Sequence, residues 1–182
     1  MDATERELVV NSLHAQRERL LNAIAGLTPE QRGFRSEPER WSVAECVEHI
    51  ILVENRVMDS IEQQLQCAPE PEKAAGAVGK ARLIMRAVPA RGTRVKTPEG
   101  AAPSGRWPDF VGLVEAFEKT RQRSIRFAVD TEADLRSHFF PHFVFKDLDC
   151  YQWLVFLGAH CERHVLQIEE IRADAGLPIG TL

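Results

Sequence analysis

The sequence has no long apolar run, no excess of positive charge and no Cys-x-x-Cys pair. The longest apolar run, Trp153–His160, is far too short to span a bilayer, and the charged N-terminal stretch 1–7 has no apolar signal core. The net charge is −4, from 23 basic and 27 acidic residues, whereas nucleic-acid-binding proteins usually carry a basic patch. We therefore expect a cytoplasmic protein that binds neither membranes nor nucleic acid.

The four cysteines are scattered along the chain, at Cys46, Cys67, Cys150 and Cys161. Three of them fall within expected helices or at a helix start. Isolated cysteines in such positions are more often buried, reduced thiols than disulfide partners. We expect no disulfide framework.

Strand patterns and internal repeats are almost absent, whereas apolar residues recur at steps of three and four over four long stretches. These stretches run from Thr4 to Gly26, from Ser42 to about Gln66, from Trp107 to Thr131 and from Asp149 to about Asp174. The 182 residues fit one domain, 1–182. The expected fold class is all-α, with a four-helix bundle as the most economical architecture.

Helix starts are marked by paired residues three positions apart, which form capping boxes. The expected pairs are Thr4–Glu7, Thr28–Gln31, Ser42–Glu45 and Asp149–Gln152. Trp41 is placed to act as a hydrophobic staple before the second long helix. Pro108 suits the first turn of the third, and Gly26 suits the end of the first.

Two regions do not follow the helical pattern. Prolines and glycines punctuate residues 67–108, where only Lys80–Arg86 predicts a short helix. A connection of this length can cross the end of a bundle and return the next helix in a parallel sense. Residues 135–148 are apolar but contain proline, and we expect a loop that covers one end of the bundle.

The residues that point most directly to chemistry are His160 and His164. Residues four apart on a helix lie about 40° apart around the axis and about 6 Å along it, so both imidazoles can reach one metal ion. Both also lie in an apolar stripe, where a polar side chain needs a partner. Position 161 is Cys, which excludes the His-Glu-x-x-His motif of metalloproteases.

Other polar residues allow more than one interpretation. His49 lies beside the apolar stripe of the second long helix and is the natural third ligand, because facing helices of a bundle direct side chains into one core site. His138 and His142 are either surface or lid residues or, for His142, part of the mouth of the site. His14 is expected to face solvent and Cys161 to point away from the ion. Glu45, Glu48 and Glu162 could support the ligands, but helical carboxylates are usually only solvated.

Three passages together carry a family resemblance. They are Leu27–Gln31 followed by Trp41–Ile50, the loop Phe140–Phe143, and the last helix from Trp153 through His160-Cys161-Glu162-Arg163-His164 to Ile168. In order and spacing they resemble the DinB family, the damage-inducible DinB/YfiT-like proteins. The resemblance covers most of the chain except residues 67–108.

The resemblance implies a four-helix bundle with an up-down-down-up path and a long crossover between helices 2 and 3. It also implies a divalent metal (Ni, Zn, Fe or Mn) held by three histidines, which map to His49, His160 and His164. The family loop often reads histidine-proline followed by a glycine, whereas this chain has His142-Phe143 and no nearby glycine. Some members of the family are transferases or isomerases that use small cellular thiols.

Three functional interpretations remain open from the sequence. The first is a metal-dependent transferase that uses a low-molecular-weight thiol, or a hydrolase, acting on a small-molecule substrate. The second is a non-catalytic, stress-related binding module whose metal site is structural or vestigial. The third, a homodimer formed through an exposed bundle face, is compatible with either.

Overall fold

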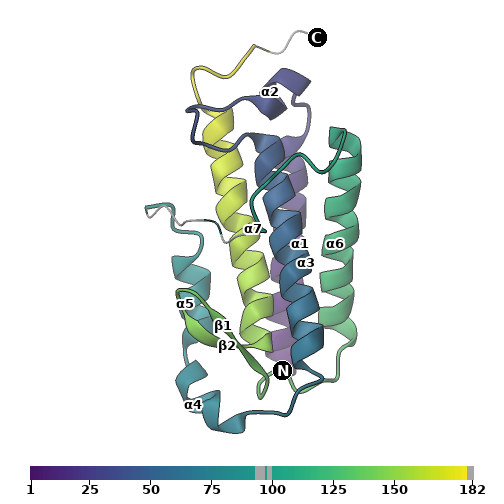
Figure 1. The fold of residues 1–182 in the computed structure, drawn as a ribbon, viewed down its shortest axis with the longest axis vertical. Helices are drawn as coiled ribbons and strands as arrows, with labels where there is room; N and C mark the ends of the chain where they lie inside the picture. The colour runs from purple at the N-terminus through teal and green to yellow at the C-terminus, as the bar shows by residue number, and fades with distance from the viewer. Residues whose placement is uncertain (93–96, 98–99, 180–182) are drawn as a thin grey trace.

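The computed structural model describes residues 1–92, 97 and 100–179 of the chain. It is mostly helical, and four long helices lie side by side (Figure 1). These are α1 (Ala3–Ile24), α3 (Val43–Gln64), α6 (Phe110–Asp130) and α7 (Cys150–Arg172). α7 packs against α1 and α3, and α6 packs against the same two helices. The long helices predicted from the apolar periodicity are thus present at the expected positions.

Three of the four predicted capping boxes are present. Thr28 begins α2 (Pro29–Gly33), Ser42 begins α3 and Asp149 begins α7, each paired with the residue three positions on. The prediction for the first helix was wrong by two residues: Asp2 accepts from the Glu5 N–H, and the Glu5 carboxylate accepts from the Asp2 N–H. Overlapping candidate boxes in the first turn cannot be separated by residue type alone.

The start of α6 also differs from the prediction. Asp109 is the cap residue, and its carboxylate accepts from the Gly112 N–H, so Pro108 lies just before the helix rather than in its first turn. An aspartate cap satisfies a free N–H at the helix start, which proline at the first helical position would not do. The other end matches, since α6 finishes at Asp130.

A small antiparallel sheet replaces the loop expected over residues 135–148. Strands β1 (Phe139–His142) and β2 (Lys146–Asp149) pair Phe139 with Asp149 and His142 with Lys146. The Phe140 ring stacks on Trp153 of α7 at 4.4 Å between centroids, and the Trp153 indole N–H donates to the Phe140 carbonyl. The all-α prediction was therefore wrong for this segment. Contacts with α7 stabilise two strands that the sequence pattern does not predict.

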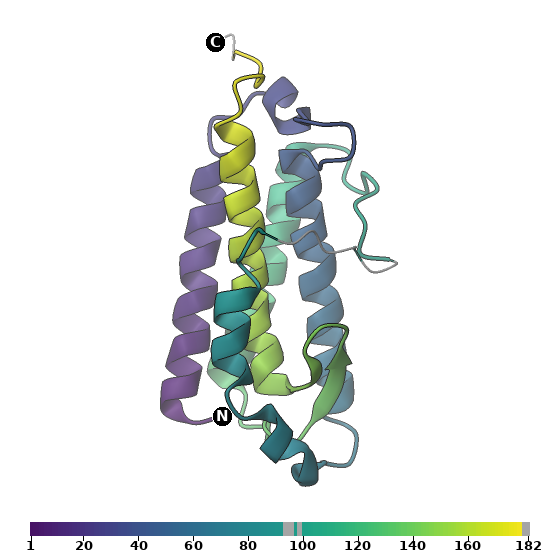
Figure 2. The same ribbon diagram turned by 90° about the vertical axis from the view of Figure 1, so that its left-hand side faces the viewer.

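The segment between α3 and α6 carries three short helices, η1 (Pro71–Lys73), α4 (Ala74–Ala77) and α5 (Lys80–Ala87). The predicted helix over Lys80–Arg86 is confirmed as α5, which packs along α7 (Figure 2). Residues 93–96 and 98–99 of the predicted long connection lie outside the described residues, as do residues 180–182.

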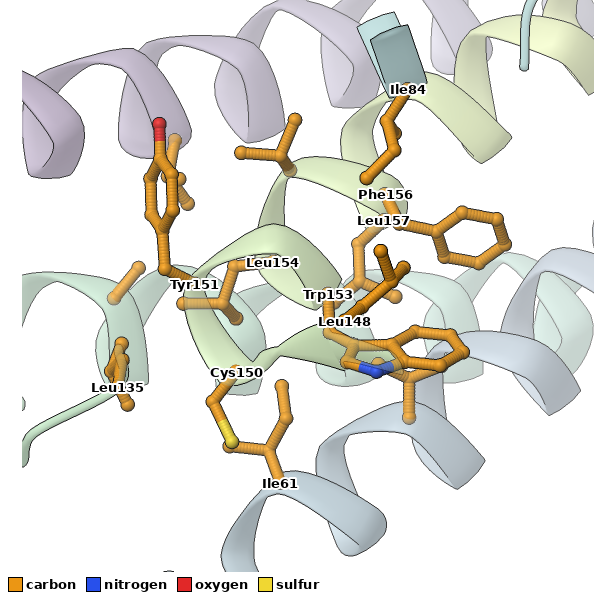
Figure 3. Packing of buried hydrophobic residues seen from close by; sticks show 14 of the residues in the cluster. Ile61, Ile84, Leu135, Leu148, Cys150, Tyr151, Trp153, Leu154, Phe156 and Leu157 are labelled. Carbon is orange, nitrogen blue, oxygen red and sulfur yellow. The ribbon is translucent and has the colours of Figure 1, made fainter. Parts of the chain in front are cut away.

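The core consists of two clusters of buried apolar side chains. One surrounds the first half of α7 and includes Ile61, Ile84, Leu135, Leu148 and Leu154 (Figure 3). The other surrounds the second half of α7 and the first half of α3, and includes Val47, Ile50, Phe117, Val165 and Ile168. Most of α7 is buried because it contacts helices on several sides. Side chains on α7 therefore have well-fixed positions.

Two further features bear on the sequence predictions. All four cysteines are free, with Cys46, Cys150 and Cys161 buried, as expected, and Cys67 exposed. Within the described part of the chain, every helix is too short or too polar to serve as a transmembrane span.

Candidate metal centre

His49, His160 and His164 come together where α3 meets α7. One ring nitrogen from each histidine lies within 4.8 Å of the other two. The Nε2 atoms of His49 and His160 are 3.2 Å apart, and the three ring centroids are separated by 4.6–5.0 Å. The structure thus groups the three residues that the sequence singled out.

The helices place these side chains through short-range and packing effects. The Ser42 capping box fixes the start of α3, so that His49 falls in its second turn and faces α7. His160 and His164 lie on successive turns of α7, which brings their rings onto one face. His49 and His164 are buried, and His160 is partly exposed.

The ring of His49 is oriented by the segment that leads to α6. Its Nδ1 lies 2.7 Å from the carbonyl oxygen of Ala101, which can only accept, so Nδ1 carries the proton and the unprotonated Nε2 faces Nε2 of His160 at 3.2 Å. The neighbouring Glu48 carboxylate accepts from the backbone N–H groups of Ser104 and Gly105, both at 2.9 Å. Consecutive residues of α3 therefore hold the segment that orients the ring.

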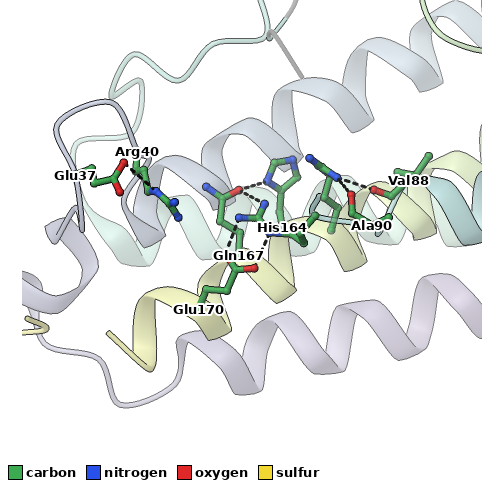
Figure 4. A network of polar contacts seen from close by, with 9 residues as sticks. Glu37, Arg40, Val88, Ala90, His164, Gln167 and Glu170 are labelled. Carbon is green, nitrogen blue, oxygen red and sulfur yellow. Dashed lines mark hydrogen bonds and ion pairs between the residues drawn. The ribbon is translucent and has the colours of Figure 1, made fainter. Parts of the chain in front are cut away.

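The ring of His164 is oriented from its own helix. Its Nδ1 donates to Oε1 of Gln167 at 3.1 Å, and the same oxygen accepts from the Arg91 guanidinium (Figure 4). Arg91 also pairs with Glu170, and Arg163 donates to the carbonyls of Val88 and Ala90. These contacts attach residues 88–91 to α7, and Nε2 of His164 is left with a free lone pair.

The electrostatic surroundings keep all three rings neutral. Burial lowers the pKa of His49, although the hydrogen bond with Ala101 opposes the shift. Burial and the neighbouring rings lower the pKa of His160 and of His164 well below the ordinary value, and Gln167 opposes this only for His164. Neutral imidazoles are the form that coordinates metal ions.

The donor set fits a divalent cation. The hydrogen bonds at Nδ1 leave Nε2 of His49 and Nε2 of His164 unprotonated, and Nε2 of His49 lies 3.2 Å from Nε2 of His160. Nitrogens in so buried a group need a partner. A cation shared by three imidazole nitrogens would satisfy them together. Three protein ligands leave at least one coordination position open, as in catalytic rather than closed structural sites.

Aromatic rings line the centre on two sides. The Trp41 ring lies 4.6 Å from that of His49 and 5.9 Å from that of His164, and the Phe156 ring stacks on His160 at 5.2 Å. Sequence reasoning assigned Trp41 to a helix staple and did not single out Phe156. The signal for Phe156 is its position one helical turn before His160.

The remaining histidines and Cys161 lie outside the three-histidine group. His14 is exposed, as expected. His138 is buried, and its two ring nitrogens lie 2.8 Å from the Asp134 carbonyl and 3.2 Å from the Cys67 carbonyl, so its reading as a surface residue was wrong. The Cys161 thiol points toward the Gln16 carbonyl of α1 rather than toward the centre, as predicted.

His142 is also buried, at the end of β1, so a surface position is excluded for it too. Its ring lies 5.0 Å from the Phe156 ring, which in turn stacks on His160. His142 is therefore next to the aromatic lining of the centre without being one of the three grouped histidines.

The three glutamates considered as supporting residues have other partners. Glu45 closes the Ser42 capping box, Glu162 pairs with Arg19, and Glu48 binds backbone N–H groups. The groups that orient the ligand rings are the Ala101 carbonyl and the Gln167 amide, which sequence reasoning missed. Gln167 could have been found from its position three residues after His164 on the same helix.

The fold and this centre define a mostly helical protein with a three-histidine group that could bind a metal ion. The family model of the DinB superfamily matches residues 12–168, and the chain belongs to this superfamily. The DinB family is metal-binding. The chain is also 22% identical over 151 residues to the uncharacterized protein YuaE of Bacillus subtilis, covering 83% of this chain and 89% of that protein. No solved structure matches the chain.

Proposed function

We propose that this chain binds one divalent metal ion through His49, His160 and His164 and uses it to transfer a low-molecular-weight thiol to a small-molecule substrate. The observation that carries the proposal is the pair of hydrogen bonds at Nδ1 of His49 and His164. Both bonds leave Nε2 unprotonated, in a group where one nitrogen of each of the three histidines lies within 4.8 Å of the other two. Rings held only for packing would not require matched tautomers.

The chain's own residues provide the binding site and control access to it. Three neutral imidazoles hold the ion, which supplies Lewis acidity and thereby favours the deprotonated form of a thiol or of water. Imidazole ligands suit nickel, zinc and iron better than manganese, which prefers oxygen donors, so the donor set favours the first three without selecting one of them. Trp41 and Phe156 exclude water from two sides of the centre.

A thiol reaction is better supported than hydrolysis. Hydrolysis benefits from a general base near the attacking water. Among the described residues no carboxylate joins the three histidines, and Glu48, on the same helix as His49, is engaged with backbone N–H groups. A thiolate is itself a reactive nucleophile and needs no such base. The hydrolase remains the second candidate activity.

We propose further that the chain is a single domain with an up-down-down-up four-helix bundle. Support comes from the packing of α7 against α1 and α3, and of α6 against the same two helices. The long segment 65–109 between α3 and α6 gives the length that a crossover needs.

Elemental analysis of the purified, metal-reconstituted protein tests the metal proposal. We expect about one divalent ion per chain. A panel of small thiols with electrophilic substrates then tests the reaction, with ester and amide substrates as the comparison for hydrolysis. A wild-type sample that takes up no metal would overturn the proposal. A sample that binds metal but turns over neither class would identify a non-catalytic binding module.

A further inference from the structure

His142 has a ring that is almost entirely enclosed by other rings. Its relative exposure is 5%, and the rings of Phe143, Phe145, Trp153 and Phe156 lie at centroid distances of 4.5, 4.9, 5.2 and 5.0 Å. An imidazole is a costly group to place among aromatic side chains unless both nitrogens are used. The position therefore calls for a partner at each nitrogen.

One of the two nitrogens has its partners in the hairpin turn. Nδ1 of His142 accepts from the backbone N–H groups of Val144 and Phe145, at 3.0 and 3.3 Å. Since Nδ1 is the acceptor, the proton of the neutral ring must lie on Nε2. Burial also lowers the pKa of His142 to about 4, so the ring is neutral at ordinary pH. The tautomer is fixed by the turn itself.

The other nitrogen of the His142 ring is an unpaired donor. Nε2 of His142 is buried and has no hydrogen-bond partner among the described residues. The nearby phenyl and indole rings carry no lone-pair acceptor, and an N–H···π contact is a weak substitute for an oxygen or sulfur acceptor. Buried N–H donors in folded proteins are nearly always paired, and an unpaired one calls for an explanation such as a ligand.

The His142 ring, which carries the unpaired donor, packs against the face of α7 that carries His160 and His164. Trp153, Phe156, His160 and His164 follow one another at steps of three and four, so they share one face of α7. The His142 ring packs on Phe156, which stacks on His160, and a charge on His142 would act on the pKa of His160. His142 is thus separated from a ligand of the centre by a single aromatic ring.

We propose that His142 is a substrate-binding residue of the three-histidine centre, whose Nε2–H donates a hydrogen bond to an anionic or neutral acceptor atom of the bound ligand. The inference rests on the proposed function, because it needs a ligand at the centre. The ligands that fit are small molecules with an oxygen, nitrogen or sulfur acceptor beside an apolar part. The apolar part would contact Phe156 and Trp153.

Two substitutions separate the donor from the turn. In His142→Asn the short amide can still accept from the Val144 and Phe145 N–H groups at the place of Nδ1, but no donor reaches the place of Nε2. In His142→Gln the longer amide can place an N–H near Nε2 but loses the Nδ1 acceptor. The exposed His14→Asn is the matched control.

The test uses the full chain loaded with cobalt(II), titrated with azide and followed through the visible absorption of the metal. We expect His142→Asn to bind cobalt as the wild type does but to bind azide about tenfold more weakly. His142→Gln should recover part of the azide affinity, and His14→Asn should match the wild type. Equal azide affinity in the wild type and His142→Asn would overturn the proposal while leaving the metal site intact.

A direct measurement covers the case in which a variant does not fold. In wild-type protein with ¹⁵N-labelled histidine and zinc in place of cobalt, His142 should be the Nε2–H tautomer. Its proton resonance should move downfield when azide is added. An Nδ1–H tautomer, or a resonance that azide leaves unchanged, would contradict the proposal. If neither the wild type nor any variant takes up metal, the proposed function is wrong, and this inference, which depends on it, is wrong as well.

Discussion

Glu54 of α3 and Arg121 of α6 form an ion pair inside the core, with 2.7 Å between Oε2 and Nη2 and side-chain exposures of 2% and 0%. Arg121 also donates to the Leu13 carbonyl of α1. One oxygen of Glu54 and the Nε of Arg121 have no hydrogen-bond partner among the described residues. A buried pair of this kind costs desolvation energy that its own attraction only partly offsets.

Removing one member of this pair should therefore harm the protein more than removing both. We expect Arg121→Met to lower the free energy of unfolding by about 3–5 kcal/mol, because Glu54 is left buried and unpaired. The double variant Arg121→Met, Glu54→Leu should recover most of this loss. Urea unfolding followed by circular dichroism measures both. A double variant that is less stable than Arg121→Met would contradict the argument.

The partly exposed pair Arg17–Glu118 provides the control for that experiment. Water screens its charges, so Arg17→Met should cost no more than about 1 kcal/mol.

Metal binding should depend on each of the three clustered histidines. His49→Ala or His160→Ala should lower the bound metal from about one ion per chain to nearly none, because two imidazoles bind a divalent ion far more weakly than three. Elemental analysis after gel filtration in a weak chelator gives the stoichiometry. His14→Ala, at an exposed position, should retain the metal. Full occupancy in His160→Ala would remove that residue from the ligand set.

The Gln167 amide should influence metal affinity without touching the ion. Gln167→Ala removes the acceptor for the His164 Nδ1–H, and we expect the metal dissociation constant to rise about 10- to 100-fold. Gln167→Glu keeps an acceptor at the same place and should bind metal more tightly than Gln167→Ala. Competition with a chromophoric chelator measures the constants. Equal affinity in the two variants would show that orientation of His164 does not depend on this contact.

Asp149, which caps α7, should make stability depend on pH. Burial raises the pKa of its carboxyl from 3.8 to about 6, although the Gln152 N–H and Arg136 oppose the shift. The folded chain then binds this proton more tightly than the unfolded chain. The resulting stabilisation is complete below the unfolded value of 3.8 and is lost as the pH rises through about 6.

The test for Asp149 compares the wild type with Asp149→Asn, which keeps the cap acceptor. Between about pH 4 and pH 7 the free energy of unfolding of the wild type should fall relative to the variant by on the order of 2 kcal/mol. The free energy of unfolding of both proteins is measured with a chelator present, so that no metal is bound. Titration of the histidines is common to both proteins and cancels in the difference between their free energies. A constant difference across this range would mean that Asp149 has an ordinary pKa.

The predictions from sequence were most accurate where the cause is local. The caps at Thr28, Ser42 and Asp149 each depend on a partner three residues away, and the pair His160–His164 depends only on helical periodicity. His49 could be predicted as a third member because a helical apolar stripe indicates which face is buried. These features need no knowledge of how the helices are arranged.

The features that were missed depend on residues distant in the chain. The Ala101 carbonyl that orients His49 is 52 positions away from it. Every residue has a backbone carbonyl, so the residue type at position 101 does not predict this contact. The hairpin at 139–149 is stabilised by packing on α7, and its proline and irregular alternation hide the strand pattern. The unpaired Nε2 of His142 likewise becomes visible only once the hairpin turn has fixed the tautomer.

His49 and His160 are 111 positions apart, although their Nε2 atoms are 3.2 Å apart in the folded chain. Bringing residues this far apart in sequence together costs loop-closure entropy. An ion held by both helices acts as a removable cross-link that closes this large loop. Separation of α3 from α7 and release of the ion would then be the same event.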